Sequence, residues 1–148
     1  YTLRTLFPYT TLFRSFGNYI FKSDTRRKKL ESIMMPFITR EIQERIRMYE
    51  EGNWQICFLD APTLIENNFH NSMDITILVW VSSDIQVQRV MIRDALKIDE
   101  TWDRIRAQMP IDEKIKFADF IIDNGGSIEN TKLQLDLIIE KLERLGVK

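Results

Sequence analysis

The sequence predicts an α/β domain in which helices cover both faces of a parallel sheet. Three short apolar runs, at residues 55–59, 75–81 and 120–122, are rich in β-branched or aromatic side chains. Because they are apolar at odd and at even positions, they are typical of central strands that are buried on both faces. Helical stretches separate the runs, and this alternation indicates a layered α/β domain.

The composition is that of one globular domain. The 148 residues are 44% hydrophobic and 29% charged, which provides a core and excludes a disordered or collagen-like chain. The formal net charge of -1 argues against a polycation that binds nucleic acid or an anionic membrane. No apolar run approaches the ~18 residues that would span a bilayer. Cys57 is the single cysteine, so we expect no internal disulfide, which fits a cytoplasmic location. It lies inside an apolar run, so we expect it in the core.

Both ends of the chain contain stretches with helical spacing. Residues 24–50 begin with Asp24 as the expected N-cap, and Gly52 is expected to end this stretch. Pro36 lacks a backbone N–H, so we expect two helices that meet near it. The final helix is expected to carry an apolar stripe made of Leu135, Ile138, Ile139, Leu142 and Leu145.

The stretch after the second apolar run predicts a helical hairpin. Ser83 and Gln86 have the S-x-x-Q spacing of a capping box that opens the first helix. Asp99 is expected to cap a second helix over residues 100–109, and Pro110 is expected to end it.

The turn Asp60-Ala-Pro-Thr-Leu-Ile-Glu66 follows the first apolar run. Ligands of open parallel sheets bind beyond the carboxyl ends of the strands. Asp60 and Glu66 are therefore candidates to meet a ligand, a magnesium ion or a hydroxyl group, and Pro62 would stiffen the turn. The alternative is that Asp60 caps a following helical turn, and the spacing favours neither interpretation.

Cationic and amide side chains gather on the predicted hairpin, at Gln86, Arg89, Arg93, Arg104, Gln108 and Lys114. Helical spacing places Gln86, Arg89 and Arg93 on one side of the first helix, and the second helix has its arginine and glutamine one turn apart. Guanidinium groups can hold two phosphate oxygens at once, so the hairpin suits a phosphate-binding lid. The alternative, which a charge run alone favours, is a solvated face paired with Asp94, Asp99 and Asp103.

The third apolar run leads into Asp123-Asn124-Gly125-Gly126. These residues tolerate positive φ, so they predict a tight turn, and Asn124 could also bond to the edge of a base. His70 is the only histidine, and neither a common zinc site nor a Ser-His-Asp triad can be built around it.

As an ordered set, these segments resemble the dephospho-CoA kinase family. The matching pieces are RRKKLESIMMPFI, FLDAPTLIE, VQRVMIRD, RIRAQMPIDEKIKFADFIIDNGG and the final helix. The resemblance implies a P-loop fold of the nucleoside-monophosphate-kinase type. It also implies transfer of the γ-phosphate of ATP, with Mg²⁺, to the ribose 3′-hydroxyl of dephospho-CoA in the cytoplasm.

The resemblance also implies roles for single residues. Substrate contacts are expected at Asp60, Pro62, Leu64 and Glu66, in a turn where Thr63 stands for the usual leucine. ATP contacts are expected at Arg89, Arg93 and Asn124, with Arg93 stabilising the transferred phosphate. The remaining lid residues are Gln86, Arg104, Gln108 and Lys114. Met35 stands where the family usually has histidine.

A glycine-rich phosphate loop is missing from the sequence. None of the five glycines is followed by Lys-Ser or Lys-Thr, although such a loop would cradle phosphates and help to hold magnesium. The resemblance thus implies that the first strand, this loop, the first helix, the catalytic base and the magnesium site lie outside the chain. This chain is therefore expected to be inactive by itself.

The first residues differ from the rest of the chain. Residues 1–15 contain no acidic side chain, and the segment TLFPYTTLFRS looks like translated sequencing adapter. We expect residues 16–148 to be the C-terminal part of the kinase domain, with a helical substrate-side region over about 16–52 and a lid over about 84–116. The alternatives are another nucleoside or nucleotide kinase and a non-catalytic binding module, and the sequence specifies no oligomeric state.

Overall fold

The computed structural model describes residues 16–17, 19–54, 56–144 and 146, and the chain divides into two compact units, Tyr1–Glu41 and Ile42–Lys148. The elements are α2 (Asp24–Glu51), η1 (Phe69–Ser72), β1 (Ile77–Trp80), α3 (Ser83–Asp94), α4 (Ile98–Ile105), α5 (Ile111–Lys114), η2 (Ile115–Phe117), β2 (Phe120–Asp123) and α6 (Ile128–Arg144). The described chain is thus mostly helical, with a small sheet in the second unit.

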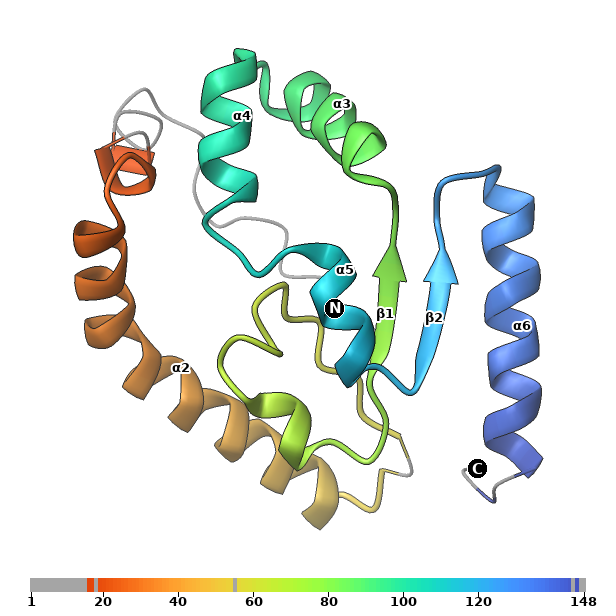
Figure 1. The fold of residues 1–148 in the computed structure, drawn as a ribbon. Coiled ribbons are helices and arrows are strands. Elements are labelled where there is room, and N and C mark those ends of the chain that lie inside the picture. The colour runs from red at the N-terminus through yellow and green to blue at the C-terminus, as the bar shows by residue number, and fades with distance from the viewer. Residues whose placement is uncertain (1–15, 18, 55, 145, 147–148) are drawn as a thin grey trace. The chain divides into compact units, whose positions relative to one another are not determined.

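β1 and β2 form a two-stranded parallel sheet (Figure 1). Ile77 is opposite Phe120, and Trp80 is opposite Asp123. The prediction of parallel strands is confirmed for the second and third apolar runs, but the prediction that both faces are buried is wrong, because Val79 and Ile121 are 52% and 43% exposed. Both strands end at the same edge of the sheet, and α3 begins three residues after β1.

Side chains satisfy backbone groups at both ends of β2. At its start, the Asp119 carboxylate accepts a 2.8 Å hydrogen bond from the Thr76 backbone N–H. At its end, Gln134 accepts a 2.8 Å bond from the Asp123 N–H and donates a 2.9 Å bond to the Asp123 carbonyl. The next N–H, of Asn124, bonds to β1, so the Asp123 peptide groups point away from β1. Gln134 of α6 therefore satisfies the outward peptide groups at the end of β2.

The first apolar run is not a strand in the structure. Residues 56–59 are irregular, and residue 55 lies outside the described residues. Phe58 is 80% exposed, and Cys57 is exposed rather than in the core. A strand is stable only beside a partner, and no described strand pairs with this run. The predictions of a strand and of a buried Cys57 are therefore wrong.

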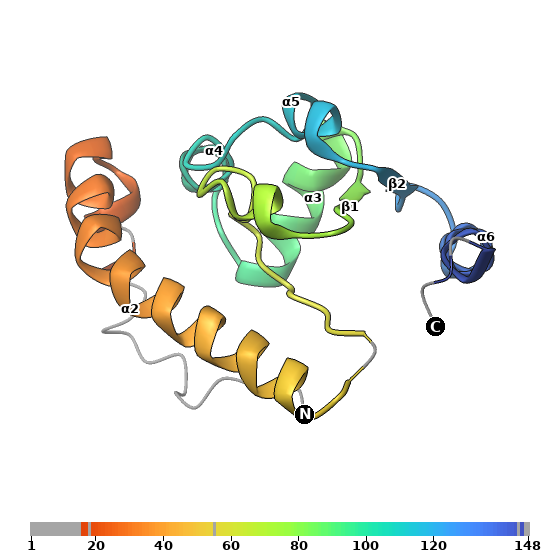
Figure 2. The same cartoon turned by 90° about the horizontal axis from the view of Figure 1, so that it is seen from below.

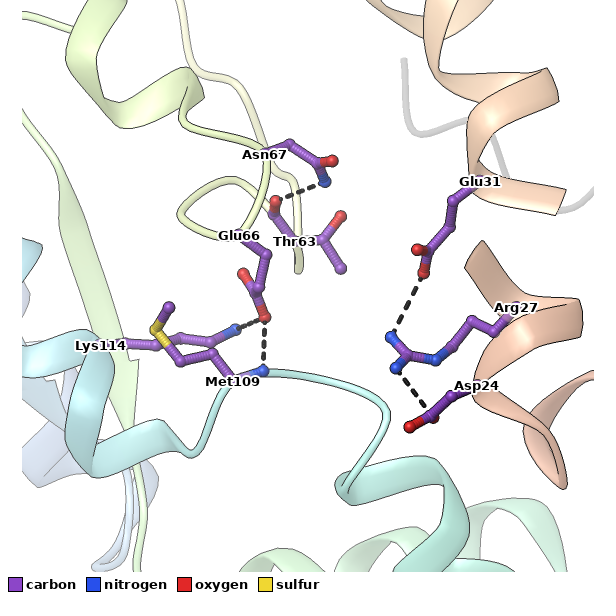
Figure 3. Close-up of polar contacts among 8 residues, drawn as sticks. All are labelled: Asp24, Arg27, Glu31, Thr63, Glu66, Asn67, Met109 and Lys114. Atoms are coloured by element: carbon purple, nitrogen blue, oxygen red, sulfur yellow. Dashed lines mark hydrogen bonds and ion pairs between the residues drawn. The ribbon is translucent and has the colours of Figure 1, made fainter. Parts of the chain in front are cut away.

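α2 is one helix of 28 residues with Pro36 inside it, so the prediction of two helices is wrong. A proline removes one N–H donor, and the good helix formers on both sides keep the helix continuous. Asp24 lies in the first turn rather than before it, and its carboxylate is 3.1 Å from Arg27 (Figure 3). Arg27 also lies 3.4 Å from Glu31. The helix ends before Gly52, as predicted.

α3 and α4 form the predicted hairpin, but their N-termini differ from the prediction. Ser82 is the N-cap of α3 and makes no side-chain capping bond. The Ser83–Gln86 capping box is therefore wrong; the Gln86 N–H bonds to the Ser82 carbonyl at 2.9 Å. Lys97, not Asp99, is the N-cap of α4, and its N–H bonds to the glutamate three residues later at 3.2 Å.

α4 is also shorter than predicted. It ends at Ile105, and the predicted helix continued to Met109. The residue before a proline is disfavoured in the α conformation, and Met109 precedes Pro110. The Met109 N–H instead donates a 3.0 Å hydrogen bond to the carboxylate of Glu66.

The buried apolar side chains of the described residues are Ile20, Ile65, Val81, Val87, Ile122 and Ile138. Of the stripe predicted on α6, Ile138 is buried, Leu135 and Ile139 are exposed, and Leu145 lies outside the described residues. Figures 1 and 2 both show α6 beside β2, which explains why Ile138 is covered. Among the described helices, none has the length and apolarity needed to cross a bilayer.

Candidate functional site

Asp94 connects two arginines from the two helices of the hairpin. Its Oδ1 accepts a 2.8 Å hydrogen bond from Arg93 Nε, and its Oδ2 accepts bonds from Arg93 Nη2 at 3.0 Å and Arg104 Nη1 at 2.8 Å. Ala95 follows with φ 52° and ψ 46°, the left-handed conformation that ends α3. Local backbone geometry and one carboxylate thus hold the end of α3 against α4.

The electrostatics of this cluster favour an ionised carboxylate. The hydrogen bond from Arg93 lowers the pKa of Asp94 most, burial opposes this, and the charges of Arg93 and Arg104 lower it further. The side chain of Asp94 is 15% exposed, that of Arg104 is 26% exposed and that of Arg93 is 73% exposed. The carboxylate is therefore enclosed, while one of its arginines faces solvent.

The other lid residues are only partly brought together. Arg89 and Arg93 are one turn apart on α3 and both are exposed, whereas Gln86 is half-buried. Gln108 is exposed and lies after the end of α4. The prediction that Gln108 and Arg104 lie on one helix is therefore wrong. The solvated-face alternative predicted an ion pair at Asp94, and that pair is present.

Glu66 and Lys114 form an ion pair of 2.8 Å between the 60–66 turn and α5 (Figure 3). Lys114 is buried and also donates a 2.9 Å hydrogen bond to the Pro62 carbonyl. Glu66 Oε1 additionally accepts the Met109 N–H, while its Oε2 is buried without a hydrogen bond to the described residues. A predicted substrate-side residue and a predicted lid residue are thus bound to each other.

The rest of the 60–66 turn is more open. Asp60 and Pro62 are exposed, and Leu64 is half-buried. The Leu64 N–H bonds to the Ala61 carbonyl at 3.1 Å, and Asp60 makes no hydrogen bond with any described residue. Its alternative role as a cap is therefore not realised in the described part of the chain.

The loop after β2 is held by side chains. In the described backbone, neither Gly125 nor Gly126 has a positive φ, so the predicted reason for the turn is wrong. The Asp123 carboxylate instead accepts the Gly125 N–H at 2.7 Å. Asn124 is half-buried, and its side-chain oxygen Oδ1 accepts a 3.1 Å hydrogen bond from the Thr131 hydroxyl. Its NH₂ group makes no hydrogen bond with the described residues.

Sequence reasoning did not identify the contact that positions α5. The Trp80 indole N–H donates a 2.7 Å hydrogen bond to the Asp112 carboxylate, which places the first turn of α5 at the end of β1. No spacing rule joins these residues; an acidic residue in the first turn of a helix is common without such a partner. The rings of His70 and Phe117 pack in a T-shaped arrangement, with their centroids 5.0 Å apart.

The described residues contain no group of three His, Cys, Asp or Glu side chains that could hold a metal ion. The donor set needed for Mg²⁺, several oxygen ligands at one point, is not assembled there.

Comparison with known proteins identifies relatives of the chain. The profile of the family "Dephospho-CoA kinase" matches residues 11–130. Dephospho-CoA kinases of Clostridium tetani and Clostridium perfringens are 43% and 41% identical over 128 and 127 residues, which is 86% of this chain in each case. The chain spans 56% and 64% of the length of these two curated relatives.

Two solved structures have a similar fold. TT1252 from Thermus thermophilus superposes with a TM-score of 0.68 at 31% identity, over 88% of this chain and 66% of that one. The dephospho-CoA kinase of Campylobacter jejuni superposes with a TM-score of 0.53 at 22% identity, over 98% and 73% of the two chains. The match of the family profile covers most of the sequence, and the chain therefore belongs to the dephospho-CoA kinase family.

Proposed function

We propose that the chain is part of an enzyme that transfers the γ-phosphate of ATP to the ribose 3′-hydroxyl of dephospho-CoA, in the cytoplasm. Membership of the family supports the reaction class. The observation that carries the proposal is the hairpin, in which one enclosed carboxylate holds Arg93 and Arg104 from two helices. The exposed thiol of Cys57 fits a reducing compartment.

In this proposal the hairpin acts on the phosphates of ATP. Phosphoryl transfer depends on positioning and on neutralising the charge of the transferred group. Arg93 is largely exposed and Arg89 lies one turn earlier on the same helix, so both can meet phosphate oxygens. Asn124 can donate its NH₂ group to a ring nitrogen of adenine.

The substrate side is proposed to be the 60–66 turn. Asp60, Pro62 and Leu64 are candidates to contact dephospho-CoA, and Asp60 is exposed in a segment without regular structure. Glu66 is the fourth candidate; in this structure Lys114 holds its first oxygen, and its second oxygen is buried. Gln86, Gln108 and Lys114 then belong to the lid as residues that support the arginines or the turn.

The chain by itself is proposed to be inactive, because its 148 residues contain no G-x-x-x-x-G-K-[ST] loop. Mg²⁺, which phosphoryl transfer requires to neutralise the charge of ATP, is proposed to bind in the intact enzyme, outside the residues described here. Residues 1–15 are proposed to be non-native, which sequencing of the DNA upstream of codon 16 would test.

The decisive experiment sequences the DNA upstream of codon 16 and compares this chain with the product of any longer reading frame found there. Each protein is incubated with ATP, Mg²⁺ and either dephospho-CoA or nucleoside monophosphates, and the products are separated by chromatography. We expect the longer protein to form coenzyme A, and this chain to form none. Phosphorylation of nucleoside monophosphates alone would assign another nucleotide kinase. An upstream frame without the glycine-rich loop, and no transfer to either acceptor, would assign a binding module.

A further inference from the structure

We propose that Asp94 is a positioning residue that holds the guanidinium groups of Arg93 and Arg104 in place for a bound triphosphate. The inference rests on the proposed function for the identity of that ligand. Asp94 does not itself contact the phosphates, because its carboxylate and a phosphate group are both anions and would repel each other. Its action is instead through the two arginines that it binds.

The first argument is geometric. Arg93 Nε and Nη2 both donate to the carboxylate of Asp94, at 2.8 and 3.0 Å. A two-point contact fixes the plane of a guanidinium group, whereas a single contact leaves it free to rotate. Arg93 is 73% exposed, and an exposed arginine without such a contact samples many rotamers.

The second argument is that the two arginines share one oxygen. Asp94 Oδ2 accepts hydrogen bonds from Arg93 Nη2 and from Arg104 Nη1. Two guanidinium groups repel each other at this range, so the anion between them makes their proximity possible. The group of three keeps an excess of one positive charge, which still attracts a polyanion.

The third argument is that the backbone fixes the carboxylate. Asp94 is the last residue of α3, and Ala95 immediately leaves the helix in the left-handed conformation. The Leu96 N–H bonds to the Met91 carbonyl at 3.2 Å, which closes the end of the helix. The Asp94 side chain is only 15% exposed. A fixed and enclosed anion orients its partners with little loss of entropy when a ligand arrives.

Asp94→Asn tests the inference because charge and position predict opposite results. Asparagine has the same shape, but it removes a negative charge and turns an NH₂ group toward one of the arginines. Electrostatics alone would strengthen the binding of a polyanion. Loss of positioning would weaken it by about tenfold, the size expected for one charge-assisted hydrogen bond.

The probe is inorganic tripolyphosphate, titrated by calorimetry into the unaltered chain, Asp94→Asn and the control Asp99→Asn. Asp99 lies exposed in the first turn of α4, so its substitution removes the same charge from the hairpin without touching the shared carboxylate. We expect weaker binding for Asp94→Asn and equal or tighter binding for Asp99→Asn. Asp94→Glu, which keeps the charge on a longer arm, should recover part of the affinity.

A second readout does not depend on the ligand. In ¹⁵N spectra, we expect the Nε–H signals of Arg93 and Arg104 to be sharp in the unaltered chain and in Asp99→Asn, and broadened by exchange in Asp94→Asn. If Asp94→Asn does not fold, as judged by circular dichroism, Asp94→Glu takes its place in both measurements and Arg104→Lys takes its place in the titration.

Three results would overturn the inference: unchanged Nε–H signals in Asp94→Asn, tripolyphosphate binding that is as tight or tighter in that variant, or no binding by the unaltered chain. The proposed function fails on a different observation, the absence of phosphate transfer to dephospho-CoA by the longer protein. Weakened tripolyphosphate binding by Asp94→Asn, together with no transfer to dephospho-CoA, would keep the positioning role and remove the proposed acceptor.

Discussion

Lys114 Nζ lies 2.8 Å from Glu66 Oε1, and this ion pair joins α5 to the 60–66 turn. Both side chains are largely removed from water, and the same ammonium group also holds the Pro62 carbonyl. A buried carboxylate that loses its cation cannot be compensated by solvent. The two residues therefore make the position of the turn depend on the segment that follows the hairpin.

Lys114→Met is expected to lower the free energy of unfolding by about 3 kcal/mol, because it leaves the carboxylate of Glu66 enclosed and unpaired. Urea denaturation followed by circular dichroism measures this change. Adding Glu66→Gln should recover part of the loss, since it removes the unpaired charge. The control is Lys116→Met, at an exposed position of η2; an equal loss in the control would contradict the assigned role of the pair.

Ala95→Gly is expected to stabilise the chain by about 0.5–1 kcal/mol. Ala95 has a φ of 52°, where an L-residue is strained by about 1–2 kcal/mol and glycine is not, although glycine adds entropy to the unfolded chain. Ala118→Gly is the matched control, because Ala118 has a φ of -102° and glycine should destabilise there. Thermal melts of both variants give the comparison, and a lower melting temperature for Ala95→Gly would contradict it.

Acid should weaken the hairpin through Asp94. The pKa of Asp94 is lowered in the folded chain, mainly by the hydrogen bond from Arg93. Its contribution to stability is thus complete above the pKa of an unfolded aspartate, about 4, and is lost as the pH falls through the lower folded value. Unfolding free energies measured between pH 7 and pH 2 should fall less steeply for Asp94→Asn than for the unaltered chain. Parallel curves would show that Asp94 does not contribute.

Arg93→Ala in the longer reading frame should lower kcat/KM for ATP by roughly 10² or more, because charge stabilisation of the transferred phosphate is lost. Steady-state assays with dephospho-CoA measure the effect. Arg93→Lys keeps the charge without the planar fork and should be intermediate. The control is Lys132→Ala, on the exposed face of α6, and an unchanged rate in Arg93→Ala would remove this residue from the proposed role.

The sequence predicted those parts of the fold that depend on local pattern. The apolar runs of β1 and β2 predicted strands correctly, because each run finds the other as its partner in the sheet. The run at residues 55–59 has a similar composition, yet strand formation depends on a neighbour that composition does not specify. Pro36 illustrates the converse, since the propensities of many residues in α2 outweigh one missing donor.

The candidate site was predictable in its residue types but not in its pairings. Helical spacing places Arg89 and Arg93 on one side of α3, as the structure has them. The bond between Glu66 and Lys114 joins segments that are distant in sequence, and each of the two had been assigned to a different part of the site. For the hairpin, the ion pairs at Asp94 confirm one pairing of the solvated-face interpretation, and the phosphate-binding lid stays a prediction.

One glutamine has a consequence for how this sheet can be extended. The Gln134 amide donates to and accepts from the Asp123 peptide groups as a neighbouring strand would. At that point β2 already has the equivalent of a second partner, so a new strand finds no unsatisfied groups with which to align. A strand that joins beside Asp123 would have to displace this glutamine, whereas no described strand lies along the side of β1 that faces away from β2. Gln134 thus disfavours the addition of a strand beside the end of β2 and leaves β1 as the favoured edge for extension of the sheet.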